Sequence, residues 1–266
     1  MPDDPVTANP WEGNRWQRDT GRETAVDAER AGGVYGWAAA AGALQDAAPV
    51  GGTEDATSTQ SPGDAYSGLI ADWPRVPPLV ARHVGGADFN EVYDYWYEHW
   101  RNPRRENDKL WCFDWAQYQL HVAKFRGTGD GRDPSTYFQL FVESDGGEGP
   151  ILTTDVARTV EAVQYLKNRL QHGVPVLIGI RLANYPRDFN PDKTTNHYVV
   201  VVGMDVDAKG PYGATCYFSY YDYLYKSTLR FYLYSVPTLA LYSTVDDTKR
   251  AVVQRRVSQV RYTVAE

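Results

Sequence analysis

One segment decides the fold: Asp108-Lys-Leu-Trp-Cys112-Phe-Asp-Trp-Ala-Gln-Tyr-Gln-Leu-His-Val-Ala-Lys-Phe125. Its large apolar residues recur every three or four positions, which predicts an amphipathic or buried helix; they are Trp111, Trp115, Tyr118, Val122 and Phe125. Cys112 falls in the first turn, where unsatisfied amides and the positive end of the helix dipole stabilise a thiolate. The segment therefore indicates a nucleophilic cysteine. The alternative is that Cys112 is a small buried apolar residue, as free cysteines often are.

A second segment supplies a partner for this thiol. It reads Asn196-His197-Tyr-Val-Val-Val-Val-Gly203, which predicts a core strand that begins at the histidine. Turn residues occupy 205–213, and residues 214–221 predict a strand that returns Asp222 to the start of the first. Nucleophile, base and orienting carboxylate thus follow in chain order as Cys112, His197 and Asp222. Asp205 and Asp207 flank the same hairpin and are alternatives to Asp222.

The flanking sequence extends the same pattern. Residues 155–172 predict a helix closed by Gly173, and residues 174–181 predict a strand that begins Val-Pro-Val. After Lys226, three more stretches favour antiparallel strands: 229–234, 239–242 and 251–264. We therefore predict an α+β fold in which the cysteine helix packs on an antiparallel sheet.

This arrangement resembles the papain-like cysteine peptidases, and it is most similar to the bacterial C39-like and NlpC/P60-like groups. The resemblance spans roughly residues 106–223. It implies a papain-like catalytic domain in which Cys112, His197 and Asp222 form the triad. Papain-like enzymes usually carry an oxyanion-stabilising Gln six residues before the cysteine, but Glu106 stands there, with Asn107 beside it. Asn107 and the Cys112 backbone amide are the candidate oxyanion donors. The Asp-Cys-Ser pattern of the NlpC/P60 group is also absent.

Composition divides the chain near residue 80. The full chain has 266 residues, and 42% of them are hydrophobic, enough for one large domain with an extension or for two small domains. Residues 1–80 hold 12 acidic residues and 5 arginines, whereas the remainder holds 22 acidic and 22 basic residues. We predict a flexible acidic N-terminal region over 1–80 and the catalytic domain over 81–266.

Several partner classes and cofactors are disfavoured. The balanced charge of residues 81–266 gives no basic face for nucleic acid. No secretory signal or membrane-spanning segment is evident. Cys112 and Cys216 are expected to be free thiols, which suits synthesis in a reducing cytoplasm. The other histidines lack metal-ligand spacing, so we expect no catalytic metal and no other cofactor.

The chain is rich in aromatic residues, with 20 tyrosines and 8 tryptophans. Such clusters pack in cores, but they also line clefts that stack on sugars or peptides. Tyr220, Tyr221 and Tyr223 flank Asp222 and are candidate substrate-binding residues.

The sequence thus favours a cysteine-dependent hydrolase of amide bonds. The bacterial resemblance, the missing secretion signal and the acidic leader suggest an effector exported by a specialised secretion system, acting on peptidoglycan stem peptides. An immunity or inhibitor protein is a possible partner. One alternative is a protein-directed cysteine peptidase or glutamine deamidase toxin. The other is a non-catalytic binding module that retains a papain-like fold.

Overall fold

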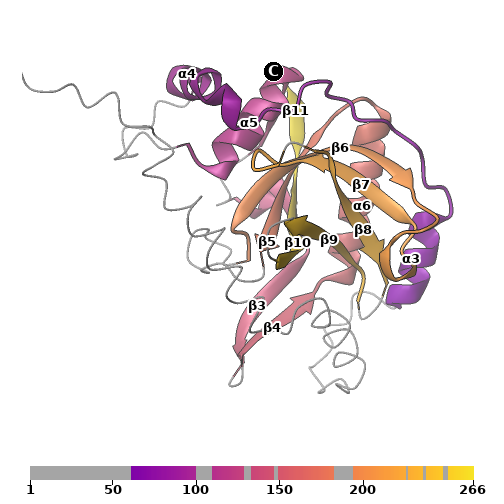
Figure 1. The fold of residues 1–266 in the computed structure, drawn as a ribbon. Helices are drawn as coiled ribbons and strands as arrows, with labels where there is room; N and C mark the ends of the chain where they lie inside the picture. Colours follow the sequence, from indigo (N-terminus) through magenta and orange to yellow (C-terminus); the bar gives the residue numbers. More distant parts are fainter. Residues whose placement is uncertain are drawn as a thin grey trace, which may run out of the picture. The chain divides into compact units, whose positions relative to one another are not determined.

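A computed structural model describes residues 61–99, 110–128, 133–146, 149–182, 194–225, 227–235, 238–247 and 251–266. Nearly all of the elements below belong to one compact unit, which comprises Gly52–Ser243 and Gln254–Glu266. The end of strand β9 and the start of strand β10, within Thr244–Val253, belong to another unit. Helices and strands are interspersed along the chain, so the α+β class predicted from the sequence is confirmed (Figure 1).

The main sheet has seven strands in the order β2-β10-β5-β6-β7-β8-β9. Its strands are β2 (Tyr137–Gln139), β5 (Val176–Leu182), β6 (His197–Val206), β7 (Cys216–Tyr221), β8 (Leu229–Tyr234), β9 (Ala240–Asp247) and β10 (Ala251–Arg261). β10 also pairs with β9, so six of the strands close into a barrel. Two small antiparallel ladders complete the strands: β1 (Phe125–Gly127) with β11 (Thr263–Ala265), and β3 (Phe141–Gly146) with β4 (Gly149–Thr154).

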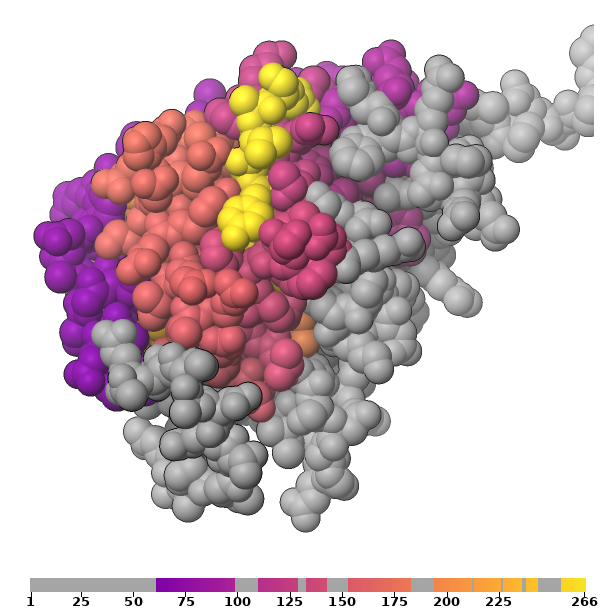
Figure 2. All heavy atoms as spheres, turned by 180° about the vertical axis from the view of Figure 1, so that it is seen from behind, coloured from indigo at the N-terminus to yellow at the C-terminus, as the bar shows by residue number. Residues whose placement is uncertain are grey.

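Four α-helices accompany the sheet in the described residues: α3 (Pro62–Ile70), α4 (Phe89–His99), α5 (Cys112–Val122) and α6 (Val156–Gln171). Three short 3-10 helices lie at Gly86–Asp88, Pro134–Thr136 and Pro211–Gly213. α5 packs on β5 and β6, while α6 packs on β2, β5 and β6. α4 packs on α5, and α3 packs on α6. The C-terminal residues lie beside α6, where Arg169 donates to the Thr263 carbonyl (Figure 2).

The ends of α6 follow from its sequence. Asp155 caps the N-terminus by accepting from the Arg158 amide, as short acidic side chains do at this position. His172 is the C-cap, and Gly173 follows with a φ of 77°. That left-handed conformation favours glycine and ends the helix. The helix predicted over 155–172 is therefore confirmed.

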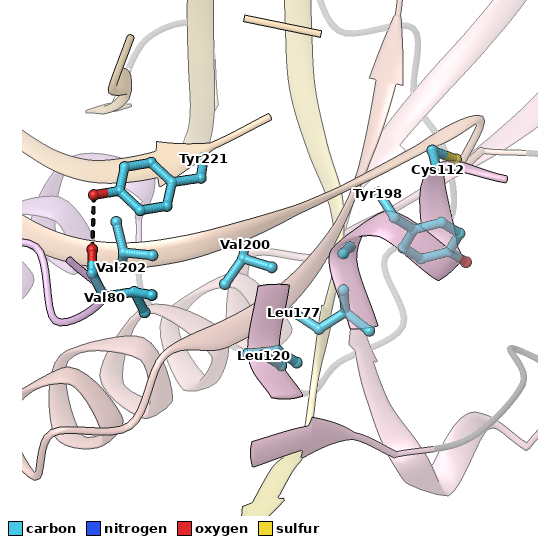
Figure 3. Close-up of a cluster of buried hydrophobic side chains, with 9 residues drawn as sticks. Val80, Cys112, Leu120, Leu177, Tyr198, Val200, Val202 and Tyr221 are labelled. Carbon is cyan, nitrogen blue, oxygen red and sulfur yellow. Dashed lines mark hydrogen bonds between the residues drawn. The ribbon is translucent and has the colours of Figure 1, made fainter. Parts of the chain in front are cut away.

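β6 is the central strand, and its first eight residues are all buried. Its β-branched valines suit an extended strand covered on both faces. One face packs under α5 in an apolar cluster (Figure 3). The buried members of this cluster are Val80, Cys112, Ala116, Leu120, Leu177, Tyr198, Val200, Val202 and Tyr221. The same packing that stabilises the fold thus fixes the helix that carries Cys112.

Residues 61–80 belong to the folded part, earlier than the boundary expected at residue 80. Val76 and Met204 exchange two backbone hydrogen bonds, of 2.8 and 2.9 Å, so the segment before Val80 lies along β6. Gly203 permits this approach, because a Cβ at that position would lie 2.7 Å from the Val76 carbonyl oxygen. Residues 1–60 lie outside the described residues.

Candidate active site

Cys112 is the first residue of α5, as the sequence predicted. Asp114 accepts from the Trp111 amide at 2.8 Å and so satisfies one of the free donors at the start of the helix. Cys112 is 9% exposed, whereas Trp111 beside it is 40% exposed. The thiol therefore lies just beneath the surface at a helix N-terminus.

His197 is the first residue of β6 and is fully buried. Its Nε2 donates to Asp222 Oδ2 at 3.1 Å. The Cys112 side chain is close enough to the same ring to raise the pKa of His197. Because Nε2 is bound to the carboxylate, Nδ1 is the nitrogen that remains for the thiol. The imidazole thus lies between a thiol and a carboxylate that come from separate elements.

Asp222 follows β7 directly and is 1% exposed. Its Oδ1 accepts from the Leu224 amide at 3.1 Å. Its Oδ2 accepts from both His197 and Arg255. These hydrogen bonds hold the carboxylate in one orientation, which in turn fixes the orientation of the imidazole. The hairpin of β6 and β7 therefore brings His197 and Asp222 together, as predicted.

Burial and charge act against each other on the pKa values of this pair. Burial alone lowers the pKa of His197, but the Asp222 carboxylate and the Cys112 thiol outweigh it and raise that pKa to about 9. Burial alone raises the pKa of Asp222, but His197 and Arg255 outweigh it and hold that pKa well below its usual range. At neutral pH the site therefore favours an imidazolium beside an ionised carboxylate.

Arg255 is the contact that sequence reasoning missed. It comes from β10, is 1% exposed, and donates from its NH1 atom to Asp222 Oδ2 at 2.5 Å. Register explains how it reaches the site: His197 is opposite Ile180, and Ile180 is opposite Val257. Arg255 precedes Val257 by two residues and therefore lies on the same face of the sheet as His197. The sequence shows Arg255 and Arg256 as a charged pair inside a predicted strand, but it does not identify the partner of Arg255.

The three candidate substrate-binding tyrosines have different surroundings. Tyr220 is fully buried, and its hydroxyl donates to Ser243 Oγ at 3.1 Å, so it cannot contact a substrate. Tyr221 is 9% exposed and donates to the Val80 carbonyl at 2.8 Å (Figure 3). The expectation for both is corrected, because strand alternation places aromatic side chains in the core on each face of β7. Tyr223 is half-buried and lies 5.8 Å from the His197 ring, so it stays a candidate.

Tyr223 also connects the site to α5. Its ring stacks on Trp115 with centroids 5.1 Å apart and an interplanar angle of 6°. On the other side of Asp222, His83 Nε2 donates to the Asp222 backbone carbonyl at 2.9 Å and stacks on Tyr221. Asp222 is thus held through its side chain and through its backbone. The role of His83 had no signal in the sequence, since it depends on a contact between distant segments.

The remaining candidates lie apart from the triad. Asp205 pairs with Arg75 at 3.3 Å, and Asp207 pairs with Arg230 at 2.8 Å. Both stand at the far end of the β6–β7 hairpin, so Asp222 is the carboxylate beside His197. His121 contacts Glu266 at 2.6 Å.

Of the two candidate oxyanion donors, Asn107 lies outside the described residues. Two glutamines of α5 are engaged elsewhere: Gln117 bonds both backbone groups of Gly127, and Gln119 bonds the Val84 amide and the Arg82 carbonyl. The Cys112 amide has no acceptor inside its own helix, because the first four amides of a helix never do.

No family model, curated protein or solved structure matched the chain in the comparisons with known proteins. Within the described ranges, no helix has the length and apolar character needed to cross a bilayer. Both cysteines are free thiols, as expected. The chemistry of the site is therefore argued from its own residues.

Proposed function

We propose that this protein is a cysteine-dependent hydrolase of amide bonds. One observation carries the proposal: His197 lies between the Cys112 thiol and the Asp222 carboxylate, and these residues come from three separate segments. A buried imidazole that bonds a carboxylate and interacts with a thiol is the arrangement that thiol hydrolases require.

In the first half of the reaction, Cys112 Sγ attacks the amide carbonyl carbon as a thiolate. A C–S bond forms, and the carbonyl π electrons move onto the oxygen, which the Cys112 amide and the helix N-terminus stabilise. When this intermediate collapses, the C–N bond breaks and His197 gives its proton to the leaving nitrogen. The products are a free amine and a thioester on Cys112.

In the second half, water attacks the thioester carbonyl and His197 accepts the proton of that water. The C–S bond then breaks, which releases a carboxylic acid and regenerates the thiolate beside the imidazolium. Asp222 stays ionised throughout and holds the imidazole in the tautomer that has Nε2–H. No cofactor is needed for either step.

The arrangement also supports the proposal that the domain is papain-like. A helix that begins at the cysteine packs on the strand that begins at the histidine. The third residue follows the next strand, and six strands close into a barrel. These features agree with the papain-like class proposed from the sequence. The closed barrel includes strands outside residues 106–223, the segment that carries the resemblance.

The class of substrate stays a prediction. Peptidoglycan stem peptides are the first choice, and a protein-directed peptidase or a glutamine deamidase is the alternative. To distinguish these, we would incubate the protein with purified cell wall and, separately, with denatured casein. Mass spectrometry would then identify muropeptide fragments, casein fragments or glutamine-to-glutamate conversion.

The controls for this assay are two alanine variants. Cys112→Ala removes the proposed nucleophile and should abolish product formation. Cys216→Ala removes the other thiol, which is 3% exposed and lies on β7, and should keep full activity. Product formation that survives in Cys112→Ala would refute the proposed function.

A further inference from the structure

Arg255 is held tightly against the third member of the triad. It is 1% exposed, and its NH1 atom donates to Asp222 Oδ2 at 2.5 Å. The same atom lies 3.4 Å from the Tyr220 hydroxyl, and the guanidinium carbon lies 4.8 Å from the centre of the Tyr225 ring. A buried arginine with these contacts cannot swing into solvent, so its positive charge is a fixed part of the site.

Counting charges shows what this arginine changes. With Arg255 and Asp222 neutralising each other, a proton that moves from Cys112 to His197 creates a balanced thiolate–imidazolium pair. Without Arg255, the imidazolium would serve as the counter-charge of Asp222. Forming the thiolate would then leave a net negative charge in a buried site, which is strongly unfavourable.

We infer that Arg255 is a positioning residue of the active site, which neutralises Asp222 so that the charge of His197 is available to stabilise the Cys112 thiolate. This inference rests on the proposed function, because it assigns Arg255 a role in activating the same cysteine. It differs from a purely structural role, in which Arg255 would only satisfy the carboxylate and stabilise the fold.

The other ionisable groups around this cluster come from several elements. Tyr220 on β7 is fully buried, and its burial raises its pKa to about 12, so it is neutral in the physiological range. Tyr223 and Tyr225 follow β7, and their phenols are also uncharged at neutral pH. His83 approaches from the segment before α4 and contacts the Asp222 backbone. Arg255 is therefore the permanent positive charge that faces Asp222 among the described residues.

The test follows iodoacetamide alkylation of Cys112 as a function of pH, in the complete protein with Cys216→Ala to leave one thiol. Three variants are compared with this background: Arg255→Met, Arg255→Lys and Arg256→Met. Arg256 is the matched control, because it is also a buried arginine on β10 but contacts Thr154 and the Phe141 ring instead of the triad.

We expect Arg255→Met to lower the alkylation rate at about pH 6.5 by tenfold or more, since one nearby charge shifts such equilibria by a pH unit or more. Arg255→Lys keeps a positive charge beside Asp222, so it should fold without an unpaired buried carboxylate and recover most of the rate. Arg256→Met should keep the pH profile of Cys112 alkylation seen in the background protein, even if this variant unfolds at a lower temperature.

Two outcomes would overturn the inference. One is an Arg255→Met profile that matches the background while His197→Ala still slows alkylation. The other is an Arg255→Lys variant that reacts as slowly as Arg255→Met, which would mean that charge balance is not what the arginine supplies. The second comparison remains decisive if Arg255→Met alone does not fold, because Arg255→Lys is then compared with the background directly. If alkylation in the background does not depend on His197, the proposed function itself fails, which is a different result.

Discussion

β6 and β10 are the two longest strands in the described part of the chain, and they bury different kinds of side chain. β6 buries valines, and one of its faces packs under α5 in an apolar cluster. β10 buries three arginines: Arg255, Arg256 and Arg261. Apolar packing tolerates small errors in position, whereas a buried guanidinium requires specific partners. The first strand therefore supplies stability, and the second supplies charge at fixed points.

Only one of these arginines contacts the triad in the described structure. Arg255 bonds Asp222, Arg256 lies 4.1 Å over the Phe141 ring, and Arg261 donates to the Tyr198 hydroxyl at 2.9 Å. The proposed active site therefore depends on two strands in different ways. β6 fixes where His197 lies, and β10 determines the charge that surrounds it.

Breaking the ion pair should have the largest effect on stability. Asp222→Ala leaves Arg255 buried without its carboxylate, so the free energy of unfolding should fall by about 3–5 kcal/mol. Urea denaturation followed by circular dichroism measures this loss. Asp205→Ala is the control, because it breaks an exposed ion pair with Arg75 and should cost about 0–1 kcal/mol. Equal losses in the two variants would contradict the role given to β10.

The pH dependence of stability tests how the charge around His197 contributes to the fold. The pKa of His197 is raised in the folded protein to about 9, so its contribution is complete below about pH 6.5 and is lost as pH rises through 9. That contribution is about 3 kcal/mol by linkage. His197→Ala should therefore flatten the decline in stability on the alkaline side, which thermal unfolding between neutral and alkaline pH can follow. An unchanged decline in the variant would show that another group is responsible.

On the acid side the sign is reversed. The pKa of Asp222 is lowered in the folded protein, so its contribution is present above the ordinary carboxyl range and is lost as pH falls below it. Asp222→Asn should make stability less sensitive to acid. Asp205→Asn is the control. Because the Asp205 carboxyl is exposed, its removal should leave the decline in stability at acid pH unchanged.

An apolar truncation in β6 should be milder than the loss of the ion pair. Val200→Ala removes two methyl groups that are 1% exposed beneath α5, which should cost about 2 kcal/mol. The same variant should leave the pH profile of Cys112 alkylation unchanged, because Val200 carries no charge. A shifted profile would mean that packing and charge are not separable in this site.

A further expected effect concerns the segment that lies along β6. Gly203→Ala places a Cβ 2.7 Å from the Val76 carbonyl oxygen, so the segment must move, at a cost of about 1–3 kcal/mol. Limited proteolysis should then cut more readily near Val76. Gly68→Ala in α3 is the control, since nothing lies within 4 Å of the added carbon. Gly213→Ala is less suitable as a control, because the φ of Gly213 is 78°.

Periodicity in the sequence was sufficient for the elements that carry the triad. The helix that begins at Cys112 and the strand that begins at His197 each have a regular pattern of apolar residues over their whole length. The hairpin predicted after Val202 also forms, and it places Asp222 beside His197. A local sequence pattern predicts a helix or strand and its pairing with the next element along the chain. The proposed triad depends on these two features.

Other features depend on contacts between distant segments, and the sequence could not reveal them. Arg255 reaches Asp222 only because β10 pairs with β5, which lies next to β6. Val76 lies on β6 although residues 1–80 were predicted to be flexible. Tyr220 was expected to line a cleft, but it alternates into the core. In each case burial is decided by tertiary packing, and composition alone gives the wrong environment.

The most direct test of the account is the pH dependence of Cys112 alkylation by iodoacetamide, measured with and without His197→Ala. Cys216→Ala serves as the background for both proteins, although burial already raises the pKa of the Cys216 thiol. We predict rapid alkylation well below pH 8 that slows sharply without His197, as a thiolate–imidazolium pair requires. Alkylation that begins only near about pH 8.5 and is indifferent to His197 would contradict the account and leave a binding module without catalytic activity.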